Sequence, residues 1–149
     1  MNHNINYKIT NKYRYLSYFF SITILASFGV QGADWTSIKK TKDYELIVDM
    51  DSYNESTGLP FITTKTIFYS HQKNAFKGKQ FLYIEELSTN QFNCKLHTYK
   101  TLTTHFYQLK DKLVASKDGM QKFETLEKGS NNALTSTLVC QVHQMVGGQ

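Results

Sequence analysis

The side chains that most often perform acid–base or nucleophilic chemistry are carboxylates, histidines and serines. Their spacing in this sequence does not assemble a catalytic site. Glu85 and Glu86 are adjacent, so in a strand they point to opposite faces. His97 and His105 would lie about 27 Å apart along an unbent strand, too far to share a metal ion. No serine lies in a Gly-x-Ser-x-Gly turn, and there is no glycine-rich phosphate loop. The sequence therefore predicts no enzyme, no cofactor and no metal site.

Cys94 and Cys140 are the two cysteines of the chain. An even pair in an oxidising compartment indicates one disulfide. Closing a loop of this length stabilises a fold by about 4 kcal/mol on the chain-entropy model. The alternative is a pair of reduced thiols that act in catalysis or bind a metal. We disfavour it because no Cys-x-x-Cys motif or cysteine–histidine cluster accompanies them.

The compartment is inferred from the first 32 residues. Lys8, Lys12 and Arg14 precede an apolar run over residues 16–30, and a small-residue cleavage site follows at Gly32. This pattern predicts a signal peptide over residues 1–32 and an exported chain. The apolar run is shorter than the roughly 20 residues that cross a bilayer, so we expect no stable membrane span after signal removal. With no cysteine at the cleavage point, we also expect no lipid anchor.

Removal of the signal changes the charge of the protein. The segment holds three of the 17 basic residues and none of the 12 acidic ones, which leaves 14 basic residues against 12 acidic ones and a net charge of +2. Arg14 is the only arginine, so the exported part has no guanidinium fork for phosphates or guanine edges. A nucleic-acid partner is therefore not expected.

Runs of aromatic and β-branched residues predict that strands dominate the exported part. Residues 51–60, which hold the only proline, and the lysine-rich residues 71–79 are predicted as loops. Asp118-Gly119 predicts a tight turn leading into residues 120–126. The predicted strands cover residues 35–38, 44–48, 61–70, 81–87, 92–107 and 109–115.

The longest predicted strand, 92–107, shows a period of two and must bend or break near Lys100. One parity is predicted to face the core, and the other, with Lys95, His97, Tyr99 and His105, to face water. The predicted core-facing set is Phe92, Cys94, Leu96, Leu102 and Phe106.

Residues 131–144 differ from the strands before them. Ser130 can cap a helix, and four apolar residues then recur at helical spacing in one stripe: Leu134, Leu138, Val142 and Met145. A strand is the alternative, because several apolar residues also share parity. We favour the helix, which gives an α+β fold: an antiparallel sheet of five or six strands with a C-terminal helix packed on it and tied by a disulfide. One domain would cover residues 33–146, followed by a disordered tail at 147–149.

Two groups of residues are candidates for partner binding. In the predicted loop 71–79, Lys73, Phe76, Lys77 and Lys79 could contact an acidic partner, or the loop could simply be solvated. On the predicted outer face of the long strand, Lys95, His97 and Tyr99 form a polar and aromatic surface. Such a surface is typical of recognition sites and equally of exposed sheet faces.

The layout of the whole exported part resembles the surface-adhesin protein E family of Gram-negative bacteria. The resemblance is carried by the signal peptide, Trp35, Asp49, Cys94, Gly129-Ser130 and Cys140. It implies an antiparallel sheet with a disulfide-held C-terminal helix, and location in the periplasm, on the cell surface or outside the cell. It also implies adhesion to host extracellular-matrix or plasma proteins, and it allows a homodimer.

The first hypothesis is therefore a non-enzymatic, adhesin-like binding module. The alternative is a periplasmic accessory protein or inhibitor that acts on a hydrolase. Small disulfide-tied β-domains include such inhibitors, and an acidic patch at Asp49, Asp51 and Glu55 could face a basic target.

Overall fold

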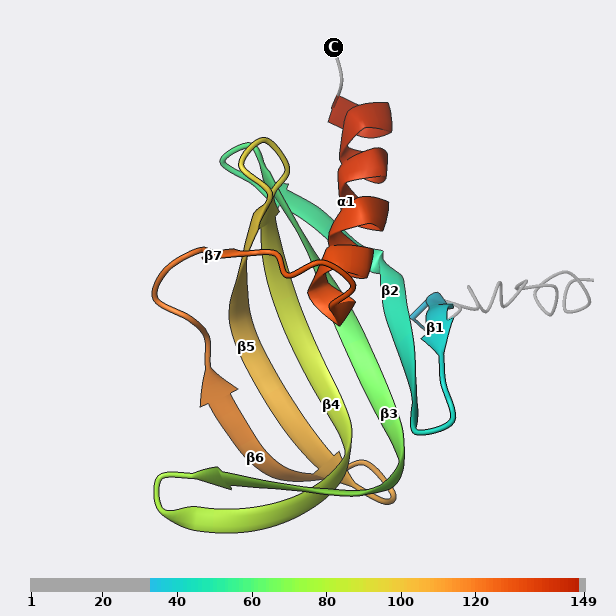
Figure 1. Ribbon diagram of the computed structural model, residues 1–149, viewed down its shortest axis with the longest axis vertical. Helices are drawn as coiled ribbons and strands as arrows, with labels where there is room; N and C mark the ends of the chain where they lie inside the picture. The colour runs from blue at the N-terminus through green and yellow to red at the C-terminus, as the bar shows by residue number, and fades with distance from the viewer. Residues whose placement is uncertain (1–32, 148–149) are drawn as a thin grey trace, which may run out of the picture. The chain divides into compact units, whose positions relative to one another are not determined.

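Six consecutive strands each pair with the next, which makes an antiparallel meander in the order β1-β2-β3-β4-β5-β6. The computed structural model describes residues 33–147, so the predicted signal peptide lies outside the described residues. A short strand, β7, pairs with β5, and the helix α1 crosses one face of the sheet (Figure 1). The elements are β1 (Trp35–Lys40), β2 (Tyr44–Ser56), β3 (Leu59–Phe76), β4 (Lys79–Asn93), β5 (Thr98–Gln108), β6 (Lys112–Asp118), β7 (Glu124–Thr125) and α1 (Asn131–Gly147).

This architecture confirms the predicted fold class. A disulfide joins Cys94, just after β4, to Cys140 in α1, with 5.6 Å between the two Cα atoms. The helix is also confirmed over the alternative strand, and Ser130 caps it by accepting a hydrogen bond from the main-chain N–H of Ala133 at 3.1 Å. The helix includes Gly147, the first residue of the predicted tail.

Both predicted loops are wrong, because the strands continue into tight hairpin turns. Between β2 and β3 only Thr57 and Gly58 turn, and between β3 and β4 only Lys77 and Gly78 do. All four residues have positive φ, between 51° and 78°, the conformation of a two-residue type I′ turn that continues the strand twist. The polar residues around these turns are therefore exposed strand ends.

The predicted strand 92–107 is wrong as a single element, because it breaks at residues 94–97 rather than near Lys100. The Asn93 side-chain oxygen accepts a hydrogen bond from the Leu96 N–H at 3.1 Å, and His97 has a φ of 50°. This turn separates β4 from β5 and leaves Leu96 70% exposed. Phe92 and Phe106 are buried as predicted.

The face that the helix presents to the sheet overlaps the predicted apolar stripe only in part, and from that stripe Leu138 packs against the core. Its buried residues are Thr135, Ser136 and Val139, whereas Leu134 is 39% exposed and Met145 is 78% exposed. The bond from Cys140 to Cys94 fixes the rotation of α1, because Ser136 and Val139 share the side of the helix that carries Cys140.

The apolar core is small and lies where α1 covers the sheet. Val48, Ile62, Phe92 and Val139 are fully buried there. Further along the same face, a row of rings from Tyr44 through Phe68 and Tyr83 to Phe81 and Phe106 has centroid separations of 4.9–6.1 Å. The interior thus changes from apolar under the helix to aromatic beyond it.

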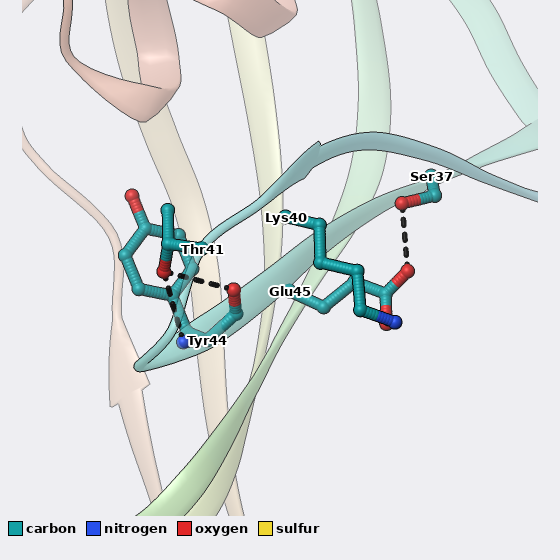
Figure 2. Close-up of polar contacts among 5 residues, drawn as sticks. All are labelled: Ser37, Lys40, Thr41, Tyr44 and Glu45. Carbon is teal, nitrogen blue, oxygen red and sulfur yellow. Dashed lines mark hydrogen bonds and ion pairs between the residues drawn. The ribbon is translucent and has the colours of Figure 1, made fainter.

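The β1–β2 hairpin holds the start of α1 in place. In Figure 2, Thr41 Oγ1 accepts a hydrogen bond from the Tyr44 N–H and donates to the Tyr44 carbonyl oxygen, each at 3.1 Å. The Ser37 hydroxyl donates to Glu45 at 2.7 Å and, together with Lys40, lowers the pKa of that carboxyl. Tyr44, fixed by this turn, donates its phenol O–H to Asn131 Oδ1 at 2.9 Å.

Candidate functional site

The lysine-rich segment predicted as a loop is the end of the β3–β4 hairpin. Lys73 lies on β3 opposite Leu82 of β4, and Phe76 lies opposite Lys79 next to the turn. Lys77 Nζ lies 5.0 Å from the centroid of the Phe76 ring. The predicted lysines and their phenylalanine therefore share the paired end of one hairpin.

This hairpin end bends toward β6. The register between β3 and β4 shifts between Ile67 and Gln72, and such an irregularity bends a strand pair. In Figure 1 the end of the hairpin, in green, curls beneath β6. Lys117 of β6 reaches across, donating to Asn74 Oδ1 at 3.1 Å, with its Nζ 5.9 Å from the Phe76 ring centroid.

A groove of about 720 Å³ lies between the β3–β4 hairpin and the β5–β6 hairpin. Two of its apolar residues, Leu82 and Leu113, are 46% and 52% exposed. Lys73 and Lys112 stand beside them, and Gln108 braces the groove by donating to the Leu82 carbonyl oxygen at 3.2 Å. We call this the hairpin groove; it is lined by Lys73, Gln80, Phe81, Leu82, Gln108, Lys112, Leu113 and Val114.

The lysines at the hairpin groove and the hairpin end carry charge that residues 33–147 do not neutralise through ion pairs. Among the described residues, ion pairs join Lys40 to Glu45 and Lys65 to Glu85, and His143 Nδ1 lies 3.1 Å from a carboxylate oxygen of Glu55. Lys73, Lys77, Lys79 and Lys112 take part in none of these, and all four are exposed. The groove can therefore offer apolar contact and positive charge together.

The second predicted group lies at the other end of β4. Lys95 and His97 are exposed in the turn at residues 94–97, not on the outer face of a strand. The predicted outward orientation of Tyr99 is wrong. Tyr99 is the Cα partner of Phe92, so it shares the face that α1 covers and packs against the core. The structure thus does not bring the two predicted groups together.

Sequence reasoning missed the contribution of β6 and of the apolar groove residues. Lys112 and Leu113 fall in the predicted strand 109–115, but that pattern gave no sign that β6 faces the β3–β4 hairpin. The bend at residues 67–72 creates this proximity, and it follows from pairing rather than from composition. Neighbouring lysines on both hairpins would have been the available signal.

Two negative findings apply to residues 33–147. No group of three or more histidine, cysteine, aspartate or glutamate side chains there is placed to hold a metal ion. No helix of this part of the chain combines the length and apolar character needed to span a membrane.

The described residues form a meander sheet with a disulfide-pinned helix and an open groove edged by lysines. The class of protein follows from a comparison with protein families. The model of the family described as surface-adhesin protein E matches residues 35–141, and the chain belongs to that family. Searches of curated proteins and of solved structures gave no match. Family membership indicates an adhesin-like surface protein with a non-enzymatic role.

Proposed function

We propose that the protein is an exported binding module that attaches to a host extracellular-matrix or plasma protein through the hairpin groove. The observation that supports this proposal is that exposed Leu82 and Leu113 lie beside Lys73 and Lys112, which form no ion pair with any residue in 33–147. Such a surface is complementary to a segment that carries both acidic and apolar side chains. The volume of the groove, about 720 Å³, accommodates a few side chains rather than a whole domain face.

The two kinds of groove residue would contribute differently to binding. Burial of the leucines would supply most of the free energy, at about 25 cal/mol for each Å² of apolar surface removed from water. The lysines would accelerate association and select acidic partners, and salt would weaken this effect. Binding through the groove therefore predicts an affinity that falls as ionic strength rises but does not vanish.

Surface plasmon resonance with immobilised vitronectin, laminin and plasminogen tests the proposal. We expect saturable binding of the purified protein to at least one of them. The lack of saturable binding to all three would remove the adhesive role. If a Leu82→Ser, Leu113→Ser double variant bound as well as the unmodified protein, the groove would be excluded as the contact surface.

Lysine variants separate specific contact from general charge attraction. Replacing Lys73, Lys77 and Lys79 by alanine should weaken binding about tenfold, from three exposed charge pairs of roughly 0.5 kcal/mol each. The matched control replaces three exposed lysines that are distant in sequence from the β3–β4 hairpin end: Lys42, Lys122 and Lys128. It changes the net charge by the same amount. Equal losses in both triple variants would mean that net charge, not the groove, governs binding.

Four further parts of the proposal need separate tests. A Lys95→Ala, His97→Ala double variant tests whether the turn at the other end of β4 also contacts the partner. Protease accessibility on intact cells distinguishes the surface from the periplasm, and mass spectrometry of the exported chain tests cleavage after Gly32. Light scattering during size-exclusion chromatography tests the homodimer.

A further inference from the structure

A second, separate cavity lies between the sheet and the first turn of α1. Its volume is about 260 Å³, and β2, β3, β4, β5 and α1 all contribute to its wall. In Figure 1 the N-terminal end of α1 lies over the middle strands of the sheet. Asn131, held by hydrogen bonds from Tyr44 and Lys39, closes the cavity on the helix side.

The wall of this cavity is polar, although it lies between a helix and a sheet. Leu46 is its one apolar residue. A buried hydroxyl or amide without a hydrogen-bond partner destabilises a fold, so core packing alone would favour apolar side chains here. The polar residues that the sheet contributes, apart from Glu86, are Thr64, Thr66, Ser88, Asn90, Thr101 and Thr104.

Hydrogen bonds orient five of these six side chains, all but Thr66. Thr101 donates to Asn90 Oδ1 at 2.8 Å, and Asn90 Nδ2 donates to Thr64 Oγ1 at 3.4 Å. The hydroxyls of Ser88 and Thr104 share a bond of 3.1 Å. A hydroxyl offers one donor and two acceptor sites, so these contacts leave donor and acceptor capacity for a ligand.

Glu86 adds a strong acceptor and restricts the charge of a ligand. Its carboxyl receives one long hydrogen bond, 3.5 Å from the Ser88 hydroxyl, and forms no ion pair within the described part of the chain. No lysine lines the cavity, although Lys117 acts on the Glu86 carboxyl from outside it and Lys39 donates to Asn131 in its wall. Glu86 is thus the one ionisable side chain in the wall, and its carboxylate would repel an anion. Burial raises the pKa of Glu86, which means that the site disfavours an isolated charge.

We propose that this cavity binds one ring of a neutral sugar or cyclic polyol. Such a molecule carries alternating hydroxyl donors and acceptors, which match the threonine and serine hydroxyls, the asparagine amides and the Glu86 carboxyl. The volume is just below the range of about 300–1,000 Å³ typical of small-molecule pockets, which fits a single ring rather than a chain. Water, at roughly 30 Å³ per molecule, is the alternative content.

Titration followed by ¹H–¹⁵N NMR tests the proposal. The neutral probes are glucose, galactose, mannose and myo-inositol, and glucosamine and glucuronate serve as charged counterparts. We expect a neutral probe to shift the amide signals of Thr66 and Thr104 saturably. The dissociation constant should be on the order of 1 mM, as for a ligand of about a dozen non-hydrogen atoms. No saturable shift at these amides, or shifts with the charged probes alone, would overturn the proposal.

A pair of variants on adjacent residues of β5 supplies the control. Thr104→Val removes a hydroxyl from the cavity wall and keeps the β-branched shape, whereas Thr103→Val removes one from the exposed neighbouring position. We expect about fivefold weaker binding for Thr104→Val, the loss of one hydrogen bond, and unchanged binding for Thr103→Val. Equal effects would refute the assignment, and Ser88→Ala replaces Thr104→Val if that variant does not fold.

Discussion

Loss of the Cys94–Cys140 disulfide should remove a large part of the stability of this domain. The bond joins residues separated by 46 positions. On the chain-entropy model, releasing a loop of that length costs about 4 kcal/mol of unfolding free energy. A domain of this size has a total of roughly 5–15 kcal/mol. A Cys94→Ala, Cys140→Ala double variant should therefore remain folded in dilute buffer only with a narrow margin.

Urea unfolding followed by far-UV circular dichroism measures this loss. With a slope of about 2 kcal/mol per M, a loss of about 4 kcal/mol lowers the transition midpoint by about 2 M. The unmodified protein under reducing conditions is the control and should match the double variant. If the transition midpoint fell by less than about 0.5 M and the slope stayed unchanged, the argument from loop length would be refuted.

The structure also predicts where the variant first becomes unstable. Val139 is the only fully buried apolar residue that α1 contributes. The other buried residues of the helix are Thr135 and Ser136. Full burial of one such side chain is worth about 1.5–3 kcal/mol, less than the disulfide. Hydrogen exchange should therefore show the α1 amides losing protection before those of β2–β5. Equal loss of protection in helix and sheet would show that the bond acts on the whole fold at once.

Three further predictions follow from single residues. Burial raises the pKa of Glu86 above its ordinary value of 4.5. The protonated carboxyl therefore contributes its full stability below about pH 4.5, and this contribution is lost as the pH rises through the folded-state pKa. Glu86→Gln should thus stabilise the protein at pH 7, with the difference disappearing below about pH 4.5 in urea titrations. Gly119→Ala should cost at least about 2 kcal/mol in thermal unfolding, because its Cβ would overlap the main-chain oxygens of Thr101 and Leu102. Val139→Ala should cost about 2 kcal/mol in urea unfolding, from two lost methyl groups and a cavity in the core.

The elements with strong local signals could be predicted from the sequence. Ser130 marks the helix start by the capping chemistry of its hydroxyl, and no glycine or proline interrupts the segment up to Gln144. The bond between Cys94 and Cys140 could be predicted because the chain has two cysteines. These features depend on residue type alone, which a single sequence displays.

The hairpin ends and the exposed helix face could not be predicted in the same way. Composition does not distinguish a polar loop from a polar strand that extends past the covered part of the sheet, as residues 71–76 do. Lys77-Gly78 and Thr57-Gly58 are two-residue turns without the Asn-Gly or Asp-Gly pair that usually marks them. The buried face of α1 depends on a bond made from 46 residues away, which helical periodicity does not include.

The extension of the β3–β4 hairpin changes what the predicted lysines can do. In a solvated loop, Lys73 and Phe76 would lose conformational freedom on binding, at roughly 1–2 kcal/mol for each ordered backbone residue. In the hairpin their backbone is already fixed by pairing with Leu82 and Lys79. The bend between Ile67 and Gln72 then places this fixed end beside β6, where apolar groove residues are available. Lysine content was the signal in the sequence, but strand pairing and the neighbouring leucines are what suit the hairpin groove to the proposed binding role.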